Sequence, residues 1–331
     1  NGTSTVYFPA GTRGYAQGHF TCLHAHCAHR TEQEYMDALG ICAARDDFHP
    51  LVNTTGEPLP PPTRLVRRKD GRIEASLVNL AIVLSKPEAC GVDIRWDNFH
   101  GQVLYKHYIP PAPTHGTQLV KYRRMLDEEG LHDGWRRWED SDYTALRLRL
   151  ERNGFVPISR QMIVDSVHLS ARENRFDSAI EWLDSISWDG VPRIAASLTR
   201  YFGARDTEYV TAVGMYMWTA LAGRVMEPGV KADMVPVFIG AQGDGKSFGV
   251  AELVPAAALY EGVDLQDRDA DLSRKMRGRL VLEIGERQGM ASRDVESLKA
   301  FITRRFDTWI PKYQECALTY PRRSLFIGTT N

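Results

Sequence analysis

The sequence predicts an α/β protein whose carboxyl-terminal part is built on a parallel sheet. Three observations predict this class. The apolar segment MVPVFI is followed by a glycine-rich turn and then by a helix-compatible segment. Two further apolar segments, RLVLEIGE and SLFIGTTN, come later, with a helical pattern between them. Apolar strands that alternate with helices in this way are typical of a parallel sheet.

Length and composition exclude several broad classes of protein. A chain of 331 residues suggests two or three domains, at roughly 150 residues each. Hydrophobic residues make up 43% and charged residues 25%, which are ordinary values for a folded protein with a sizeable core. No apolar run approaches the ~20 residues of a membrane helix. The net charge of −1 means that any nucleic-acid surface must be local.

Two further features bear on the compartment and on the chain ends. The five cysteines are odd in number and widely spread, which argues against a disulfide scaffold. Because no signal peptide is present, we expect a cytoplasmic protein without a membrane partner. The chain begins with Asn1 rather than Met and ends at Asn331 directly behind an apolar run, so we expect an internal fragment.

Three linkers divide the chain. Residues 53–63 and 109–117 are too rich in proline for a helix or a central strand, and residues 187–193 carry Asp-Gly and Pro. We expect a partial zinc-binding segment, then an accessory domain of α+β and helical character, then the domain with the parallel sheet. Their expected bounds are residues 1–52, 63–187 and 188–331.

The accessory domain alternates between helix and strand patterns. EASLVNLAIVLS has the pattern of a helix, and GVDIRWD and VLYKHYI have the pattern of strands. YTALRLRLERNG and SRQMIVDSVHLSARENR are typical of amphipathic helices. Residues 194–224 predict two more helices, which lead into the parallel sheet.

A phosphate-loop motif follows the first strand of that sheet. GAQGDGKS matches G-x-x-x-x-G-K-[ST] and has the strand–loop–helix context that the motif requires. Backbone N–H groups of such a turn surround phosphate oxygens, while Lys246 supplies charge and Ser247 a ligand for Mg²⁺. The alternative is a glycine-rich loop with a solvated lysine. We expect nucleotide contacts from Gly240, Gln242, Gly243, Gly245, Lys246, Ser247 and Phe248.

The two later strands supply acidic and amide side chains. RLVLEIGE carries Glu283 and Glu286, and we expect both, with Ser247, to hold Mg²⁺. Glu286 is expected to be better placed for the metal or the attacking water. The alternative for Glu283 is a carboxylate at a sheet edge or in a salt bridge, and for Glu286 an ordinary surface acid. SLFIGTTN ends in Asn331, whose amide can orient water. The expected catalytic residues are Lys246, Glu283, Glu286 and Asn331.

These motifs resemble the virulence-associated protein E family of phage, prophage and pathogenicity-island proteins, over about Trp188 to Asn331. That family is similar to superfamily 3 helicases on a P-loop AAA+ core. The resemblance implies an ATP- and Mg²⁺-dependent hexamer that translocates on single-stranded DNA in a bacterial host cell. Two departures stand out. The two acids are separated by two residues instead of adjacent, and the arginine finger and lid are not within the sequence.

The segment between the acidic strand and the last strand is basic, and FDTWIPKYQECALTY can form a hairpin. In superfamily 3 helicases the corresponding hairpin grips the DNA backbone in a central pore, a role that the resemblance implies here for Lys299, Arg305, Lys312 and Tyr313. The alternative is a solvated basic loop. The basic residues of the whole segment are Lys299, Arg304, Arg305, Lys312, Arg322 and Arg323.

The first segment carries a cluster of cysteines and histidines, HFTCLHAHCAHRT, of a density that suits Zn²⁺. It resembles the zinc-binding end of phage primase-like proteins. That resemblance implies Cys22 and Cys27 as zinc ligands in the intact protein, with His24 or His26 as alternatives and two further ligands before Asn1. The alternative is a histidine-rich surface turn.

Two functions from different classes remain. The favoured one is an ATP-dependent DNA helicase or replication motor of a phage or mobile element. The other is a DNA-binding replication-initiation or interference scaffold, in which bound ATP orders an oligomer; its DNA contacts would come from the basic run at residues 64–72 and the zinc segment. Asp93, Asp97 and His100 lie close together, but their spacing suits no metal, and we interpret them as structural.

Overall fold

The computed structural model describes residues 5–8, 19–22, 64–108, 131, 134–265, 267–285, 295–310 and 317–331. The chain divides into two compact units, Asn1–Pro61 and Pro62–Asn331. In the first unit, β1 (Thr5–Phe8) pairs antiparallel with β2 (His19–Cys22). Among the described helices, none has the length and the apolar character needed to cross a membrane.

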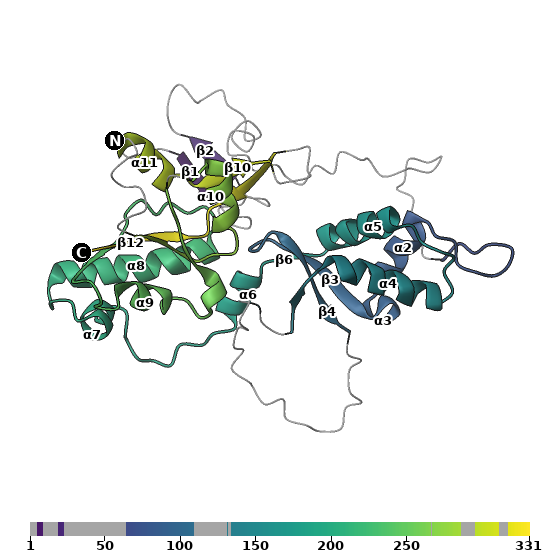
Figure 1. Ribbon diagram of the computed structural model, residues 1–331, viewed down its shortest axis with the longest axis horizontal. Coiled ribbons are helices and arrows are strands. Elements are labelled where there is room, and N and C mark those ends of the chain that lie inside the picture. The colour runs from purple at the N-terminus through teal and green to yellow at the C-terminus, as the bar shows by residue number, and fades with distance from the viewer. Residues whose placement is uncertain are drawn as a thin grey trace. The chain divides into compact units, whose positions relative to one another are not determined.

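The second unit begins with an α+β part around a four-stranded sheet of order β5-β4-β3-β6. Strands β3, β4 and β6 of this sheet are labelled in Figure 1. The segments predicted to be strands, β3 (Val92–Asp97) and β4 (Gln102–His107), form an antiparallel hairpin. The short strands β5 (Arg136–Arg137) and β6 (Arg175–Phe176) flank it. The helices of this part are α2 (Leu77–Leu84), α3 (Pro87–Cys90), α4 (Asp140–Arg152), α5 (Arg160–Glu173) and α6 (Ser178–Asp184).

Apolar spacing and polar caps explain why these helices form and pack. Leu80 of α2, Ile94 of β3 and Val167 of α5 are fully buried in one cluster. The hydroxyls of Ser76 and Ser159 accept hydrogen bonds from the first turns of α2 and α5, and such a cap stabilises a helix by about 1 kcal/mol. The predicted helices of this part are confirmed at α2, α4 and α5.

The second part of this unit holds a parallel sheet of order β7-β12-β9-β8. Its strands are β7 (Val237–Ile239), β8 (Tyr260–Gly262), β9 (Val281–Ile284) and β12 (Leu325–Thr330). The strand that ends before Asn331 therefore lies between the strand before the glycine-rich loop and the acidic strand. The helical elements are α7 (Ser197–Phe202), α8 (Glu208–Met226), α9 (Lys246–Ala251), η2 (Ala257–Leu259), α10 (Asp269–Met276) and α11 (Val295–Ile302).

Helices cover both faces of the parallel sheet, which explains the continuous apolar runs in its strands. Val281 and Ile327 face a cluster with residues of α7, α8 and α9. Leu282 and Phe326, the neighbours of those two residues, face a second cluster with residues of α10 and α11. The parallel α/β architecture predicted from the sequence is confirmed.

An antiparallel hairpin lies between α11 and β12. Strands β10 (Phe306–Trp309) and β11 (Leu318–Pro321) pair with Phe306 opposite Pro321 and Trp309 opposite Leu318. The predicted hairpin is therefore confirmed. Residues 311–316 at its tip lie outside the described residues.

A buried ion pair and an apolar cluster join the two parts of the second unit. Arg323 donates to both carboxylate oxygens of Asp177 at 2.6 and 2.9 Å, and both side chains are largely buried. Beside them, Phe99 packs in one cluster with Val225 and Leu280. Because Asp177 and Phe99 belong to the α+β part, these contacts tie it to the parallel-sheet part.

Candidate functional site

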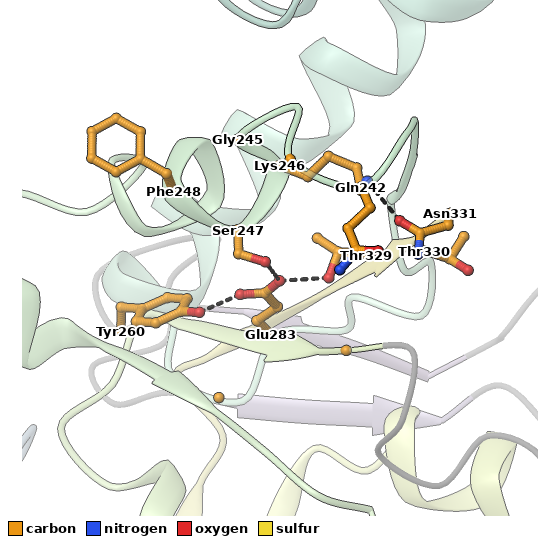
Figure 2. Close-up of a pocket in the computed structure, with 13 residues that line it drawn as sticks. Gln242, Gly245, Lys246, Ser247, Phe248, Tyr260, Glu283, Thr329, Thr330 and Asn331 are labelled. Carbon is orange, nitrogen blue, oxygen red and sulfur yellow. Dashed lines mark hydrogen bonds between the residues drawn. The ribbon is translucent and has the colours of Figure 1, made fainter.

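A cavity of about 760 Å³ lies at the carboxyl-terminal edge of the parallel sheet (Figure 2). Its walls are the glycine-rich loop before α9 and the ends of β8, β9 and β12. Because these strands are parallel, their carboxyl ends meet at one edge, where open α/β sheets bind ligands. The volume falls within the range of small-molecule sites.

Two glycines with positive φ shape the loop. Gly243 has a φ of 94° and Gly245 a φ of 77°, a region that residues with a Cβ atom rarely adopt. Gly245 directly precedes Lys246, the first residue of α9, and the loop follows β7. The strand–loop–helix context predicted for the motif is therefore confirmed.

Lys246 connects the loop to the end of β12. Its Nζ atom donates to the carbonyl oxygens of Gly240 at 2.5 Å and Ala241 at 2.8 Å. It also donates to Oδ1 of Asn331 at 3.1 Å (Figure 2). The loop lysine and the amide expected to act with it are thus adjacent in space, although they are 85 residues apart in sequence.

Glu283 lies at the centre of the cavity floor and is only 5% exposed. One carboxylate oxygen accepts hydrogen bonds from the hydroxyls of Ser247 at 2.6 Å and Thr329 at 2.5 Å. The other accepts one from the hydroxyl of Tyr260 (Figure 2). Glu283 is therefore neither at a sheet edge nor in a salt bridge among the described residues; its partners are three neutral hydroxyls.

Tyr260 is a site residue that the sequence analysis missed. Burial, together with the hydrogen bond to the Glu283 carboxylate, raises the pKa of its phenol well above the ordinary value. The phenol therefore stays a donor to Glu283 over the physiological range. The three-residue strand β8, which carries Tyr260, is too short to give a periodic signal.

The cavity brings together most of the residues expected to act on a nucleotide. Phe248 lies at its wall with a side chain that is 71% exposed. Gly240 does not line the cavity, and contributes its carbonyl to Lys246 instead. Glu286, expected to be the better-placed acid, lies outside the described residues. The expected residues that do line the cavity are Gln242, Gly243, Gly245, Lys246, Ser247, Phe248, Glu283 and Asn331.

The residues expected to bind DNA are dispersed. Lys299 is exposed on α11. Arg305 precedes β10 and donates from Nε to the carbonyl oxygen of Gly229 at 2.7 Å, so its Nε–H group already has a hydrogen-bond partner within its own domain. Lys312 and Tyr313 lie outside the described residues.

Two of the basic residues counted on this segment do not contribute to its surface. Arg322 is 2% exposed and forms a bidentate ion pair with Asp307, at 2.6 and 2.9 Å. Arg323 is 7% exposed and pairs with Asp177. The sequence alone does not show that each of these arginines has a buried carboxylate as its partner.

The zinc prediction stays a prediction. Cys27 and the side chain of Cys22 lie outside the described residues, and only the backbone of Cys22 is placed, at the end of β2. Within the ranges that the structure describes, no group of three or more His, Cys, Asp or Glu side chains is arranged to hold a metal ion.

Residues 183–331 match the family model described as the virulence-associated protein E-like domain. The resemblance seen in the motifs is therefore confirmed over this part of the chain, which contains the whole cavity. A search of the curated proteins gives no match.

Among solved structures, two similar chains are apo forms of the C-terminal region of NrS-1. One has a TM-score of 0.40 and 13% identity, and the match covers 73% of this chain and 54% of that chain. The other has a TM-score of 0.40 and 14% identity, with 76% and 57% covered. The chain therefore spans just over half the length of these structures. Structural similarities with a TM-score of 0.40 do not establish a shared fold.

Proposed function

We propose that residues 188–331 form the P-loop AAA+ core of an ATP-dependent DNA helicase or replication motor of a phage or mobile element. The proposal rests on one observation. Lys246, Ser247 and Glu283, which come from the glycine-rich loop and the acidic strand, meet at one cavity, with Ser247 and Glu283 joined by a 2.6 Å hydrogen bond. A solvated glycine-rich loop would not require a buried carboxylate behind its serine.

The donors at this cavity fit Mg²⁺ with a nucleotide. A hydroxyl and a carboxylate are the hard oxygen ligands that Mg²⁺ prefers. In this proposal Ser247 and Glu283 would hold the metal, with Glu286 as a further acid, and the metal when bound would offset charge on the phosphates. The hydroxyls of Tyr260 and Thr329 would keep the carboxylate of Glu283 aimed at the cavity.

The remaining residues of the site would bind and orient the reacting groups. Lys246 would exchange loop carbonyl partners for phosphate oxygens, which are stronger acceptors because they are charged. The amide of Asn331, adjacent to Lys246, can accept and donate hydrogen bonds and so orient a hydrolytic water. The exposed ring of Phe248 offers a face on which a nucleobase can stack.

The resemblance to superfamily 3 helicases supports the finer parts of the proposal. We propose a homo-oligomer, a hexamer in the intact protein, that binds single-stranded DNA in the cytoplasm of a bacterial host. Lys299, Arg305, Lys312 and Tyr313 would contribute the DNA contacts of its hairpin region. An arginine from an adjacent subunit would stabilise the charge that develops at the γ-phosphate.

The test is ATP hydrolysis by the intact protein, with and without single-stranded DNA. We expect DNA to stimulate hydrolysis and Lys246→Ala to abolish it. Lys86→Ala, which removes an exposed lysine far along the chain from the loop, is the matched control and should hydrolyse ATP at the parental rate.

Two outcomes would contradict the motor. Tight ATP binding with no turnover in the presence of DNA would favour the scaffold, in which ATP only orders an oligomer. A folded Lys246→Ala protein that hydrolyses ATP at the parental rate would exclude the phosphate loop as the site of hydrolysis.

A further inference from the structure

A second cavity, of about 450 Å³, lies where the β3–β4 hairpin meets α10 and the β10–β11 hairpin. We call it the arginine cleft. None of the described residues that line it is acidic, and its volume is within the range of small-molecule sites. It shares no lining residue with the phosphate-loop cavity. The lining residues that matter here are Arg137, Arg274, Arg277, Arg279, Trp309 and Tyr320.

The positive charge of the cleft is only partly balanced. Arg274 pairs with Asp271 at 3.0 Å and Arg279 with Glu261 at 3.4 Å, but both arginines are partly exposed. Arg277 donates only to backbone carbonyl oxygens among the described residues, those of His100 at 3.2 Å and Asn98 at 3.4 Å. A guanidinium with no carboxylate partner in a cavity wall favours an anionic ligand.

Burial lowers the pKa of Arg277 to about 10, so its side chain is still charged at neutral pH. The guanidinium lies over the ring of Tyr320, 3.2 Å from its centroid. Tyr320 in turn lies beside Trp309, with ring centroids 4.9 Å apart and an interplanar angle of 35°. Trp309 is 8% exposed, so Tyr320 is the ring that a base can reach. The cleft therefore places an aromatic ring next to its cations, the combination that binds a base together with its phosphate.

Two buried nitrogen atoms belong to residues of the same wall. The His100 side chain is 4% exposed, and its Nδ1 is 2.6 Å from Oδ2 of Asp97. Its Nε2 atom has no hydrogen-bond partner among the described residues, and neither has Nε2 of Gln102. Both residues line the cleft. Buried polar atoms without partners are rare in folded proteins, so these two nitrogen atoms could each take a further hydrogen bond if their side chains shifted toward the cleft.

We propose that the arginine cleft is a second nucleotide-binding site, which takes one phosphate with its base and needs no Mg²⁺. The arginines would bind the phosphate, and the ring of Tyr320, backed by the buried ring of Trp309, would stack on the base. The ligand is either a nucleotide within single-stranded DNA or a free nucleotide, since both present this chemistry. The site goes beyond the proposed function and does not depend on ATP hydrolysis at the phosphate loop.

The experiment isolates the cleft from the phosphate loop. Binding of a fluorescent oligothymidylate is measured in EDTA with the Lys246→Ala chain, so that neither Mg²⁺ nor the loop lysine contributes. In this background, the double substitution Arg137→Ala with Arg274→Ala, which we call the cleft pair, should weaken binding about tenfold or more. The dependence of log K on log salt should become shallower by roughly 0.7, the change expected for one lost phosphate contact on a single strand.

A matched pair controls for the loss of two charges. The control pair, Arg152→Ala with Arg205→Ala, removes two exposed arginines outside the cleft and should leave the affinity for the oligothymidylate nearly unchanged. Tyr320→Leu should weaken binding of the oligothymidylate but not of an abasic deoxyribose-phosphate strand, which has no base to stack. Equal affinities in the cleft pair and the control pair, with both proteins folded, would overturn the proposal.

Competition identifies the source of the nucleotide. If thymidine monophosphate displaces the oligothymidylate from the Lys246→Ala chain but not from the chain that also carries the cleft pair, the cleft accepts free nucleotides. If only oligonucleotides compete, the cleft binds a strand. If both competitors displace the oligothymidylate equally from the chain with the cleft pair and from the chain with the control pair, the result counts against the site. This holds whether or not the phosphate loop hydrolyses ATP.

Discussion

Glu283 and Asp97 are both buried carboxylates at or near the end of a strand, yet they sit in opposite surroundings. Among the described residues, the carboxylate of Glu283, at β9, accepts hydrogen bonds only from the hydroxyls of three side chains, and it faces an open cavity. Asp97, at the end of β3, is fully buried. It accepts from the backbone N–H groups of Phe99, His100 and Ser178, from the Ser178 hydroxyl and from the His100 ring.

The difference lies in which partners can be exchanged. A hydroxyl can rotate away from Glu283 and leave a carboxylate oxygen for a metal ion or water at little cost. The backbone donors around Asp97 cannot move without unfolding the turn that they hold, so Asp97 can act only as a structural group. Burial of a carboxylate is therefore a weak sign of function, and the mobility of its partners is a stronger one.

The largest expected effect is on hydrolysis. Glu283→Gln should lower ATP turnover by the intact protein about a hundredfold or more, because the amide cannot accept a proton or bind a metal as the carboxylate does. Its side chain keeps the same shape, so thermal unfolding should change little. Glu261→Gln on the adjacent strand β8, outside the cavity, is the control and should retain parental turnover. Equal losses of ATP turnover in both variants would show that Glu283 has no special role in hydrolysis.

Asp97→Asn should have the opposite effects to Glu283→Gln, a loss of stability with no loss of nucleotide binding at the phosphate loop. We expect a loss of about 2–4 kcal/mol in the free energy of unfolding, measured in urea, because buried donors lose an acceptor. Affinity for ATP with Mg²⁺ at the phosphate loop should stay parental. Asp93→Asn, on the same strand and in a partly exposed pair with Arg95, should cost less than about 1 kcal/mol. A large loss of affinity for ATP with Mg²⁺ in Asp97→Asn would contradict the conclusion that Asp97 is a structural group.

The same carboxylate predicts a dependence on pH. Burial acts to raise the pKa of Asp97. The hydrogen bonds from His100 and Ser178 and the charge of His100 act more strongly in the opposite direction, so the pKa lies below its ordinary value of 3.8. A depressed carboxylate pKa contributes stability above the unfolded-state value, and that stability is lost as the pH falls through the folded-state value. Acid titration of urea unfolding should show this loss below about pH 4 in the parent but not in Asp97→Asn.

A smaller effect is expected from Tyr260→Phe. It removes one of the three donors to Glu283 and should slow ATP hydrolysis about threefold to tenfold, because the carboxylate is then less firmly oriented. Tyr216→Phe is the control: its hydroxyl donates to the carbonyl of Met234, away from the cavity. If Tyr260→Phe hydrolyses ATP as the parent does, Tyr260 does not position the carboxylate.

The smallest effect is expected from Ser178→Ala. Asp97 loses one hydroxyl donor at 2.8 Å but keeps the backbone N–H of the same residue. The free energy of unfolding should fall by about 1 kcal/mol, with no change in hydrolysis. Ser185→Ala, whose hydroxyl is exposed, should change it by less than about 0.5 kcal/mol. Equal costs at the two serines would mean that Asp97 does not depend on this hydroxyl.

The sequence predicts the phosphate-loop region better than the Asp97 region, for a physical reason. A glycine-rich turn, a lysine and buried parallel strands leave local patterns, so the loop, β9, β12 and the hairpin were all predictable. The contact of Lys246 with Asn331 follows once those strands are parallel. Tyr260 could not be found in this way, because its role depends on pairing between β8 and β9.

Long-range pairs explain the other differences. Asp97 and Ser178 are 81 residues apart, and Arg323 and Asp177 are 146 apart. Neither partnership leaves a pattern in nearby residues, so Arg323 could only be counted as a basic residue. The arginine cleft likewise draws on β4, β5, α10 and the β10–β11 hairpin, and no single segment of the sequence carries its signature.

The most direct test of the central claim is the affinity of this chain for ATP, because binding at the loop needs no adjacent subunit. Titration calorimetry with Mg²⁺ should show binding by the parent and by Asp97→Asn, and an affinity at least about tenfold weaker in Lys246→Ala and in the parent with EDTA. If the folded Lys246→Ala chain binds ATP with Mg²⁺ as tightly as the parent, the cavity with Glu283 at its floor is not the nucleotide site.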